Sequence, residues 1–120
     1  MEWTLHSDQP IYTQLVGHLT RAILSGALAP GERLPAVREL AAQAGVNPNT
    51  MQRAMAELEQ SGLIFAQRTS GRFVTEDAAV IETAKRGLAR REVVAFLDTM
   101  ARLGYRKEQV LQLLQEKEEI

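Results

Sequence analysis

The feature that most constrains this chain is a pair of helical segments separated by only a few residues. Apolar side chains recur at helical spacing within residues 37–44, and Gly45 is a typical helix terminator. Asn47 and Pro48 then supply a side-chain cap and a proline whose fixed φ suits the first helical position. We therefore expect a second helix, ending at Gly62. Its buried stripe is expected to comprise Met51, Ala54, Met55 and Leu58.

The flanking segments place this pair in a known order of elements. Before it, a helical stripe follows Pro10 and stops at Gly26, and Asp8 is expected to act as the capping acid. After it, residues 63–66 and 72–75 are β-prone and flank a polar turn, which predicts a β-hairpin. This order of elements is that of a winged helix-turn-helix: a helix, a short helix, a tight turn, a longer helix and a hairpin. In that fold the third helix enters a major groove of DNA.

Two further helices are expected after the hairpin. One runs over residues 78–103, with Glu76-Asp77 as its cap, and the other over residues 107–119. The sequence contains no internal repeat and no low-complexity segment. The chain is thus expected to be mostly α-helical.

The helix over residues 78–103 carries more apolar surface than one neighbour can cover. From Val93 onward it is apolar almost all round, which is atypical of a soluble monomer. We expect a second copy to cover this surface in an isologous twofold interface; the alternative is that the helix packs against its own chain. The expected interface residues are Ile81, Leu88, Val93, Phe96, Leu97, Met100 and Leu103. The expected fold is mostly α with a small β-hairpin: a winged helix-turn-helix DNA-binding domain over residues 1–77 and a two-helix dimerisation tail over residues 78–120.

The third helix has a polar face opposite its buried stripe. At 100° per residue, Asn49 and Arg53 fall opposite that stripe, and Thr50 and Gln52 flank it. Asn or Gln can pair bidentately with adenine and Arg with guanine. These side chains therefore suit contact with base edges.

The charge near the third helix favours DNA binding more than the net charge of the whole chain does. Fourteen basic and fifteen acidic residues give a net charge of −1, yet Arg38, Arg68 and Arg72 bracket the third helix from neighbouring elements. Arginines in these places would contact phosphates and set the register of the helix on the duplex. For each arginine alone, the alternative is a solvated surface or an ion pair worth only ~0–1 kcal/mol.

Several motifs resemble the GntR family of bacterial transcriptional regulators. They are Pro10-Ile11-Tyr12-Thr13-Gln14-Leu15, Pro30-Gly31, Leu34-Pro35, Arg38-Glu39-Leu40-Ala41, Gly45-Val46-Asn47-Pro48-Asn49-Thr50 and Leu58-Glu59-Gln60-Ser61-Gly62-Leu63-Ile64. The Asn-Pro-Asn-Thr motif and the short tail are most similar to the YtrA subfamily of small dimeric repressors, which often control transporter operons. The resemblance implies a homodimer on a palindromic operator of double-stranded DNA.

The resemblance also implies roles for single residues. Arg38 matches an arginine of the second helix, Thr50 a hydroxyl of the recognition helix, and Gly71 the glycine at the tip of the wing. With the residue pattern, it predicts a DNA-binding set of Arg38, Asn47, Asn49, Thr50, Gln52, Arg53, Arg68, Gly71 and Arg72.

The sequence departs from the family pattern at several positions. Many members have arginine where Pro48 and Gln52 stand here, so base preferences cannot be carried over. The usual Leu-Pro-Ser before the second helix is Leu-Pro-Ala, so Ala36 cannot provide a side-chain cap, at an expected cost of ~1 kcal/mol.

Other classes of function find no support in the sequence. There is no cysteine, and His6 and His18 lack neighbours at metal-ligand spacing, so we expect no metal site and no cofactor. No nucleophile or phosphate-loop signature is present, so an enzyme is not expected. No apolar run reaches the ~20 residues of a membrane span, so we expect a cytosolic protein. The resemblance implies a bacterial cytosol and association with the nucleoid when bound to DNA.

The expected function is sequence-specific, DNA-binding regulation of transcription. We expect repression, because no surplus segment is available to recruit RNA polymerase. The alternative is an adaptor whose winged fold binds a protein and not DNA. A small-molecule effector, unidentified, stays open as a further partner.

Overall fold

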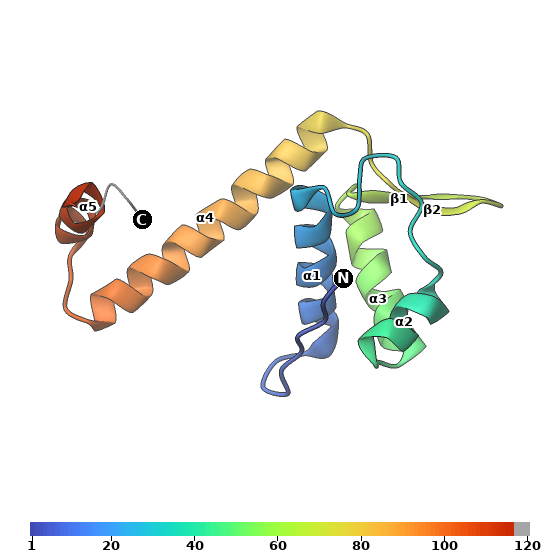
Figure 1. Ribbon diagram of the computed structural model, residues 1–120, viewed down its shortest axis with the longest axis horizontal. Coiled ribbons are helices and arrows are strands. Elements are labelled where there is room, and N and C mark those ends of the chain that lie inside the picture. Colours follow the sequence, from blue (N-terminus) through green and yellow to red (C-terminus); the bar gives the residue numbers. More distant parts are fainter. Residues whose placement is uncertain (117–120) are drawn as a thin grey trace. The chain divides into compact units, whose positions relative to one another are not determined.

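The computed structural model describes residues 1–116, and their elements follow the predicted order (Figure 1). They are α1 (Ile11–Ser25), α2 (Val37–Ala44), α3 (Pro48–Gln60), β1 (Ile64–Gln67), β2 (Gly71–Val74), α4 (Ala78–Arg102) and α5 (Lys107–Glu116). The fold class is therefore confirmed: a winged helix-turn-helix followed by C-terminal helices. The part of the last predicted helix beyond residue 116 lies outside the described residues.

The prediction that Asp8 caps α1 is wrong. Pro10 occupies the N-cap position, and no side chain accepts a hydrogen bond there. The segment before α1 is held by Gln14 instead. The Gln14 side chain accepts a hydrogen bond from the His6 N–H at 2.7 Å and donates one to the His6 carbonyl at 2.6 Å. Gly26 ends the helix at φ +85, as predicted.

The helix-turn-helix itself forms as predicted. Gly45, at φ +71, ends α2 in the left-handed conformation that favours glycine. Asn47 caps α3, because its Oδ1 accepts a hydrogen bond from the Asn49 N–H at 2.8 Å. Ala36, at the N-cap of α2, makes no such bond, so one helix of the pair is capped by a side chain and the other is not.

We expect Ala36→Ser to stabilise the protein by about 1 kcal/mol, because a hydroxyl at this position can accept from a free N–H of the first turn. The backbone of Ala36 is already extended (φ −62, ψ 153), as a capping residue requires. Thermal unfolding should show a rise in Tm of a few degrees. Ala42→Ser, on the exposed side of the same helix, is the control and should give no gain. Equal gains from both variants would contradict the capping argument.

The third helix lies at the centre of the core. It contacts α1, α2 and β1, and it lies beside α1 in Figure 1. Its predicted stripe of Met51, Ala54, Met55 and Leu58 is at most 1% exposed. Because this face is fixed inward, the opposite face of α3 is held in solvent.

The hairpin pairs β1 and β2 antiparallel, with Ile64 opposite Val74 and Gln67 opposite Gly71. Each predicted strand is shifted by one residue in the structure. Phe65 and Phe73 are also opposite each other, and their rings stack with centroids 5.8 Å apart. The predicted β-hairpin is therefore present after α3.

A third segment joins the hairpin, and no pattern in the sequence predicts it. Arg33 forms a β-bridge with Phe73, and the Leu34 N–H donates to the Arg72 carbonyl at 2.9 Å. The Val74 N–H donates to the carbonyl of Glu32 at the same distance. These bonds tie the connection between α1 and α2 to the wing.

Contacts divide the chain into a unit of Met1–Ala84, here called the head, and a second unit that starts at Lys85. The first turns of α4 belong to the head, where Val80 and Ala84 pack against the core. The predicted cap of α4 is confirmed, since Asp77 Oδ1 accepts from the Ala79 N–H at 2.9 Å. The functional boundary between residues 77 and 78 stays a prediction.

The fourth helix is exposed or half-buried at every position. None of its 25 residues is buried. In the second unit, Val110 of α5 is buried, and it lines an open cavity of about 600 Å³ with Leu97 and Tyr105. No helix among residues 1–116 is long and apolar enough to cross a membrane.

Candidate nucleic-acid interface

The outer face of α3 carries the polar side chains that were predicted to contact base edges. Asn49, Gln52 and Arg53 are exposed, and Thr50 is half-buried beside them. Ala56, one turn further along, is exposed and small, so it leaves the helix surface free of bulk there. This face can offer amide, hydroxyl and guanidinium groups to a ligand.

Arg53 is supported by α1. Its guanidinium carbon lies 3.7 Å from the centroid of the Tyr12 ring, in a cation–π stack. In the sequence Tyr12 stands only within the motif of residues 10–15, and no local pattern connects it to Arg53. The stack restricts the guanidinium to one side of α3 and reduces the entropy that Arg53 would lose on binding.

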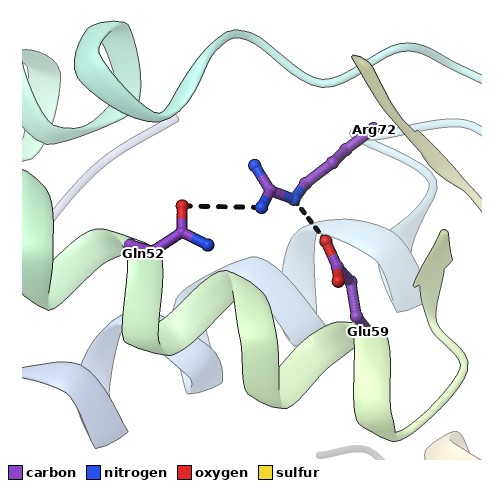
Figure 2. Close-up of polar contacts among 3 residues, drawn as sticks. All are labelled: Gln52, Glu59 and Arg72. Carbon is purple, nitrogen blue, oxygen red and sulfur yellow. Dashed lines mark hydrogen bonds and ion pairs between the residues drawn. The ribbon is translucent and has the colours of Figure 1, made fainter. Parts of the chain in front are cut away.

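A second support comes from the wing. Arg72 of β2 forms an ion pair through its Nε with Glu59 Oε1, and its Nη2 donates to Gln52 Oε1 at 3.4 Å (Figure 2). An unpaired Glu59 would repel a polyanion such as DNA. Its charge is paired in the structure, so the outer face of α3 is less acidic than the sequence implied.

The wing carries Arg68 and Gly71 of the predicted set, and Arg33 lies beside it. Arg68 is exposed in the turn between the strands. Gly71 has φ +103, and a Cβ there would lie 3.1 Å from Arg33 Nε, so both the backbone and the neighbouring guanidinium favour glycine. Arg33 is absent from the predicted site because its place beside the wing depends on the bridge to Phe73.

The structure places all nine residues of the predicted DNA-binding set in the head. Their contact with DNA stays a prediction. The half-buried members are Thr50 and Arg72, and the exposed ones are Arg38, Asn47, Asn49, Gln52, Arg53, Arg68 and Gly71.

The predicted dimer residues range from half-buried to exposed. Val93, Phe96 and Leu103 have 54%, 44% and 68% of their surface exposed. The half-buried members are Ile81, Leu88, Leu97 and Met100. A substantial apolar surface of α4 is therefore open to a partner.

Within residues 1–116, no group of three or more His, Cys, Asp or Glu side chains is arranged to hold a metal ion.

Comparison with known proteins agrees with this arrangement. The family model described as "Bacterial regulatory proteins, gntR family" matches residues 11–74. The chain is 37% identical over 112 residues to the uncharacterized HTH-type transcriptional regulator YhcF of Bacillus subtilis (strain 168), covering 93% of each chain. It is 42% identical over 72 residues to the HTH-type transcriptional repressor YtrA of the same organism, covering 60% of this chain and 55% of YtrA. The predicted likeness to YtrA-type regulators is confirmed.

Solved structures share the fold. A GntR family transcriptional regulator from Listeria monocytogenes superposes with a TM-score of 0.84 at 36% identity, covering 93% of this chain and 98% of that one. The DNA-binding domain of AraR, solved in complex with operator ORE1, gives a TM-score of 0.54 at 28% identity and covers 62% of this chain and 94% of that one. By its family match, its relatives and its winged helix-turn-helix, the chain belongs to the GntR family of DNA-binding transcriptional regulators.

Proposed function

We propose that the chain acts as a homodimeric repressor on an inverted-repeat operator in the bacterial cytosol. The observation that carries this proposal is α4, a helix of 25 residues without one buried residue and with large apolar side chains in solvent. A second copy that lays the same helix against it would remove this surface from water in a twofold interface. In this proposal residues 1–77 bind DNA and residues 78–120 dimerise.

Twofold symmetry links the tail to the form of the operator. Helix-turn-helix dimers place their recognition helices ~34 Å apart, in successive major grooves on one side of the duplex. A twofold dimer then reads the same half-site twice, in opposite directions. The AraR domain bound to an operator supports this use of the head, and the name of YtrA as a repressor supports the sign of regulation.

Within each half-site the exposed residues would divide into two groups. Asn49, Thr50, Gln52 and Arg53 would face base edges from α3, and Arg38 and Arg68 would contact phosphates from α2 and the wing. Asn47, Gly71 and Arg72 complete the proposed interface by shaping the helix start and the wing.

Selection of bound duplexes from a random pool tests this proposal. The expected result is an inverted repeat whose half-site centres lie ~10–10.5 base pairs, or a multiple of that, apart. Transcription in vitro from a promoter that overlaps the selected site should fall when the protein is added. Enrichment of a single half-site would contradict the dimer, and increased transcription would contradict repression.

The Tyr12–Arg53 stack leads to a separate prediction. We expect Tyr12→Ala to weaken operator binding by about 5- to 30-fold, because each head of the dimer loses ~0.5–1 kcal/mol of cation–π support. Tyr12→Phe keeps the aromatic face and should stay within about twofold of the wild type. Fluorescence anisotropy on the selected operator measures both, and circular dichroism checks the fold. An equal loss from both variants would assign the effect to the hydroxyl and not to the stack.

A further inference from the structure

The wing reaches back to the recognition helix through one side chain. Arg72 of β2 contacts two residues of α3 that lie seven positions apart, Gln52 and Glu59, and so spans about two helical turns (Figure 2). The Arg72 side chain is 24% exposed and that of Glu59 is 32% exposed. Arg72 is thus partly withdrawn from solvent, unlike the exposed Arg38 and Arg68.

The chemistry of the two groups decides how Gln52 is turned. A guanidinium has only hydrogen-bond donors, so the oxygen of the Gln52 amide must face it. The amide nitrogen, with its two donors, forms no bond with Arg72 and stays available to a ligand; Figure 2 draws only the oxygen in the bond. Glu59 holds Arg72 in place through the Nε, which leaves the Nη2 for Gln52.

We propose that Arg72 is a positioning residue that sets the base preference of Gln52, and that it does not serve as a phosphate contact. This inference rests on the proposed contact of Gln52 with a base edge. Bidentate pairing of Gln with adenine uses the amide oxygen as acceptor and the nitrogen as donor. The bond from Arg72 takes one of the two lone pairs of this oxygen and fixes the amide, so its two donors are the groups that Gln52 mainly offers, and they match the N7 and O6 acceptors of guanine.

The ion pair with Glu59 argues against the alternative role of Arg72. A phosphate contact would require the guanidinium to leave both partners on α3, or to share its donors between a carboxylate and a phosphate. Arg38 and Arg68 are exposed and have no such pair among the described ion pairs of residues 1–116. They are the better phosphate ligands.

Binding measured on a panel of operator duplexes tests the inference. The panel places each of the four base pairs at each half-site position, and Gln52→Ala identifies the position that Gln52 reads. At that position the wild type should favour guanine over adenine. Arg72→Met should reduce this ratio by about fivefold or more, with little change for random duplex or for the salt dependence of binding.

Arg72→Lys separates geometry from charge. Lysine keeps the positive charge but lacks the planar fork that joins Glu59 to Gln52, so base preference should relax as in Arg72→Met. A phosphate contact would instead be largely kept by lysine. Combined with Gln52→Ala, neither variant should change the preference at that position any further.

Glu59→Gln is the sharpest variant, with Glu57→Gln as its matched control. Both remove one negative charge from α3, but Glu57 is exposed and only Glu59 forms the described pair with Arg72. We expect Glu59→Gln to relax the preference at the Gln52 position and Glu57→Gln to leave it unchanged. If Glu59→Gln instead tightens binding to all duplexes more than Glu57→Gln does, Arg72 is a restrained phosphate contact and the inference is wrong.

The same data separate failure of the inference from failure of the proposed function. A wild type without base preference at any position contradicts the proposed operator recognition. A wild type whose preference survives Arg72→Met and Arg72→Lys contradicts only the positioning role. A uniform loss of affinity in Arg72→Met, with a salt slope reduced by about one per head, contradicts it as well.

Discussion

Replacing Val93 by glutamate is expected to convert the protein to a monomer and to weaken binding to an inverted repeat by about 10²- to 10⁴-fold. Val93 lies on the exposed apolar stripe of α4 and has 54% of its surface exposed in the single chain. A carboxylate at this place would be buried without a partner in the proposed interface, which is strongly unfavourable. Without the dimer, the second half-site no longer benefits from high effective concentration.

Val94→Glu provides the matched control for this prediction. Val94 adjoins Val93 and is similarly exposed, at 58%, but it points about 100° away around the helix. The control should keep the dimer. Sedimentation velocity measures the oligomeric state, and titration of an isolated half-site should show equal affinity for both variants. Monomers from both variants, or dimers from both, would contradict the interface as assigned.

Asn49→Ala should abolish most of the operator preference, with a loss of about 30- to 10⁴-fold. A good bidentate base contact is worth ~1–3 kcal/mol, and a dimer loses it in both heads. Asn49 is exposed at the second position of α3, and only its backbone N–H takes part in the cap. Its side chain can therefore be removed without disturbing the fold. Affinity for random duplex should change little, because that binding comes from phosphate contacts.

Gln60→Ala is the control for Asn49→Ala. It removes an exposed amide from the last residue of the same helix, ~16 Å along its axis from Asn49. We expect no change in operator preference. A comparable loss at Gln60, or an unchanged preference in Asn49→Ala, would show that α3 does not enter the groove by its N-terminal half. Competition binding with selected and scrambled duplexes makes the comparison.

From the sequence, the residues of the candidate site could be predicted only element by element, as the face of each helix or strand that they occupy. The stripe of Met51, Ala54, Met55 and Leu58 is buried as predicted, so Asn49, Gln52 and Arg53 could be assigned to the outer face of α3. The support of those side chains could not be predicted. Tyr12 precedes Arg53 by 41 residues, and Arg72 follows Gln52 by 20, so no local pattern connects them.

One local prediction failed for a local reason. Asp8 and Pro10 form a common start signal for a helix, yet Pro10 takes the N-cap position itself. Asp8 therefore lies two residues before the N-cap, and the residues before α1 are held instead by Gln14, which bonds the backbone of His6. A glutamine inside the first turn carries no start signal that a sequence pattern could use.

By itself the sequence determined where the helices begin and end and which faces they bury. These properties depend on interactions within a few residues: the glycine at the end of α2, the Asn47 cap, and apolar side chains at helical spacing. The tertiary structure alone decided that Arg33 joins the wing, that Tyr12 supports Arg53, and that Arg72 connects Glu59 to Gln52. Those contacts form only after the core has packed, because burial of α3 brings residues distant in the chain within reach of one another.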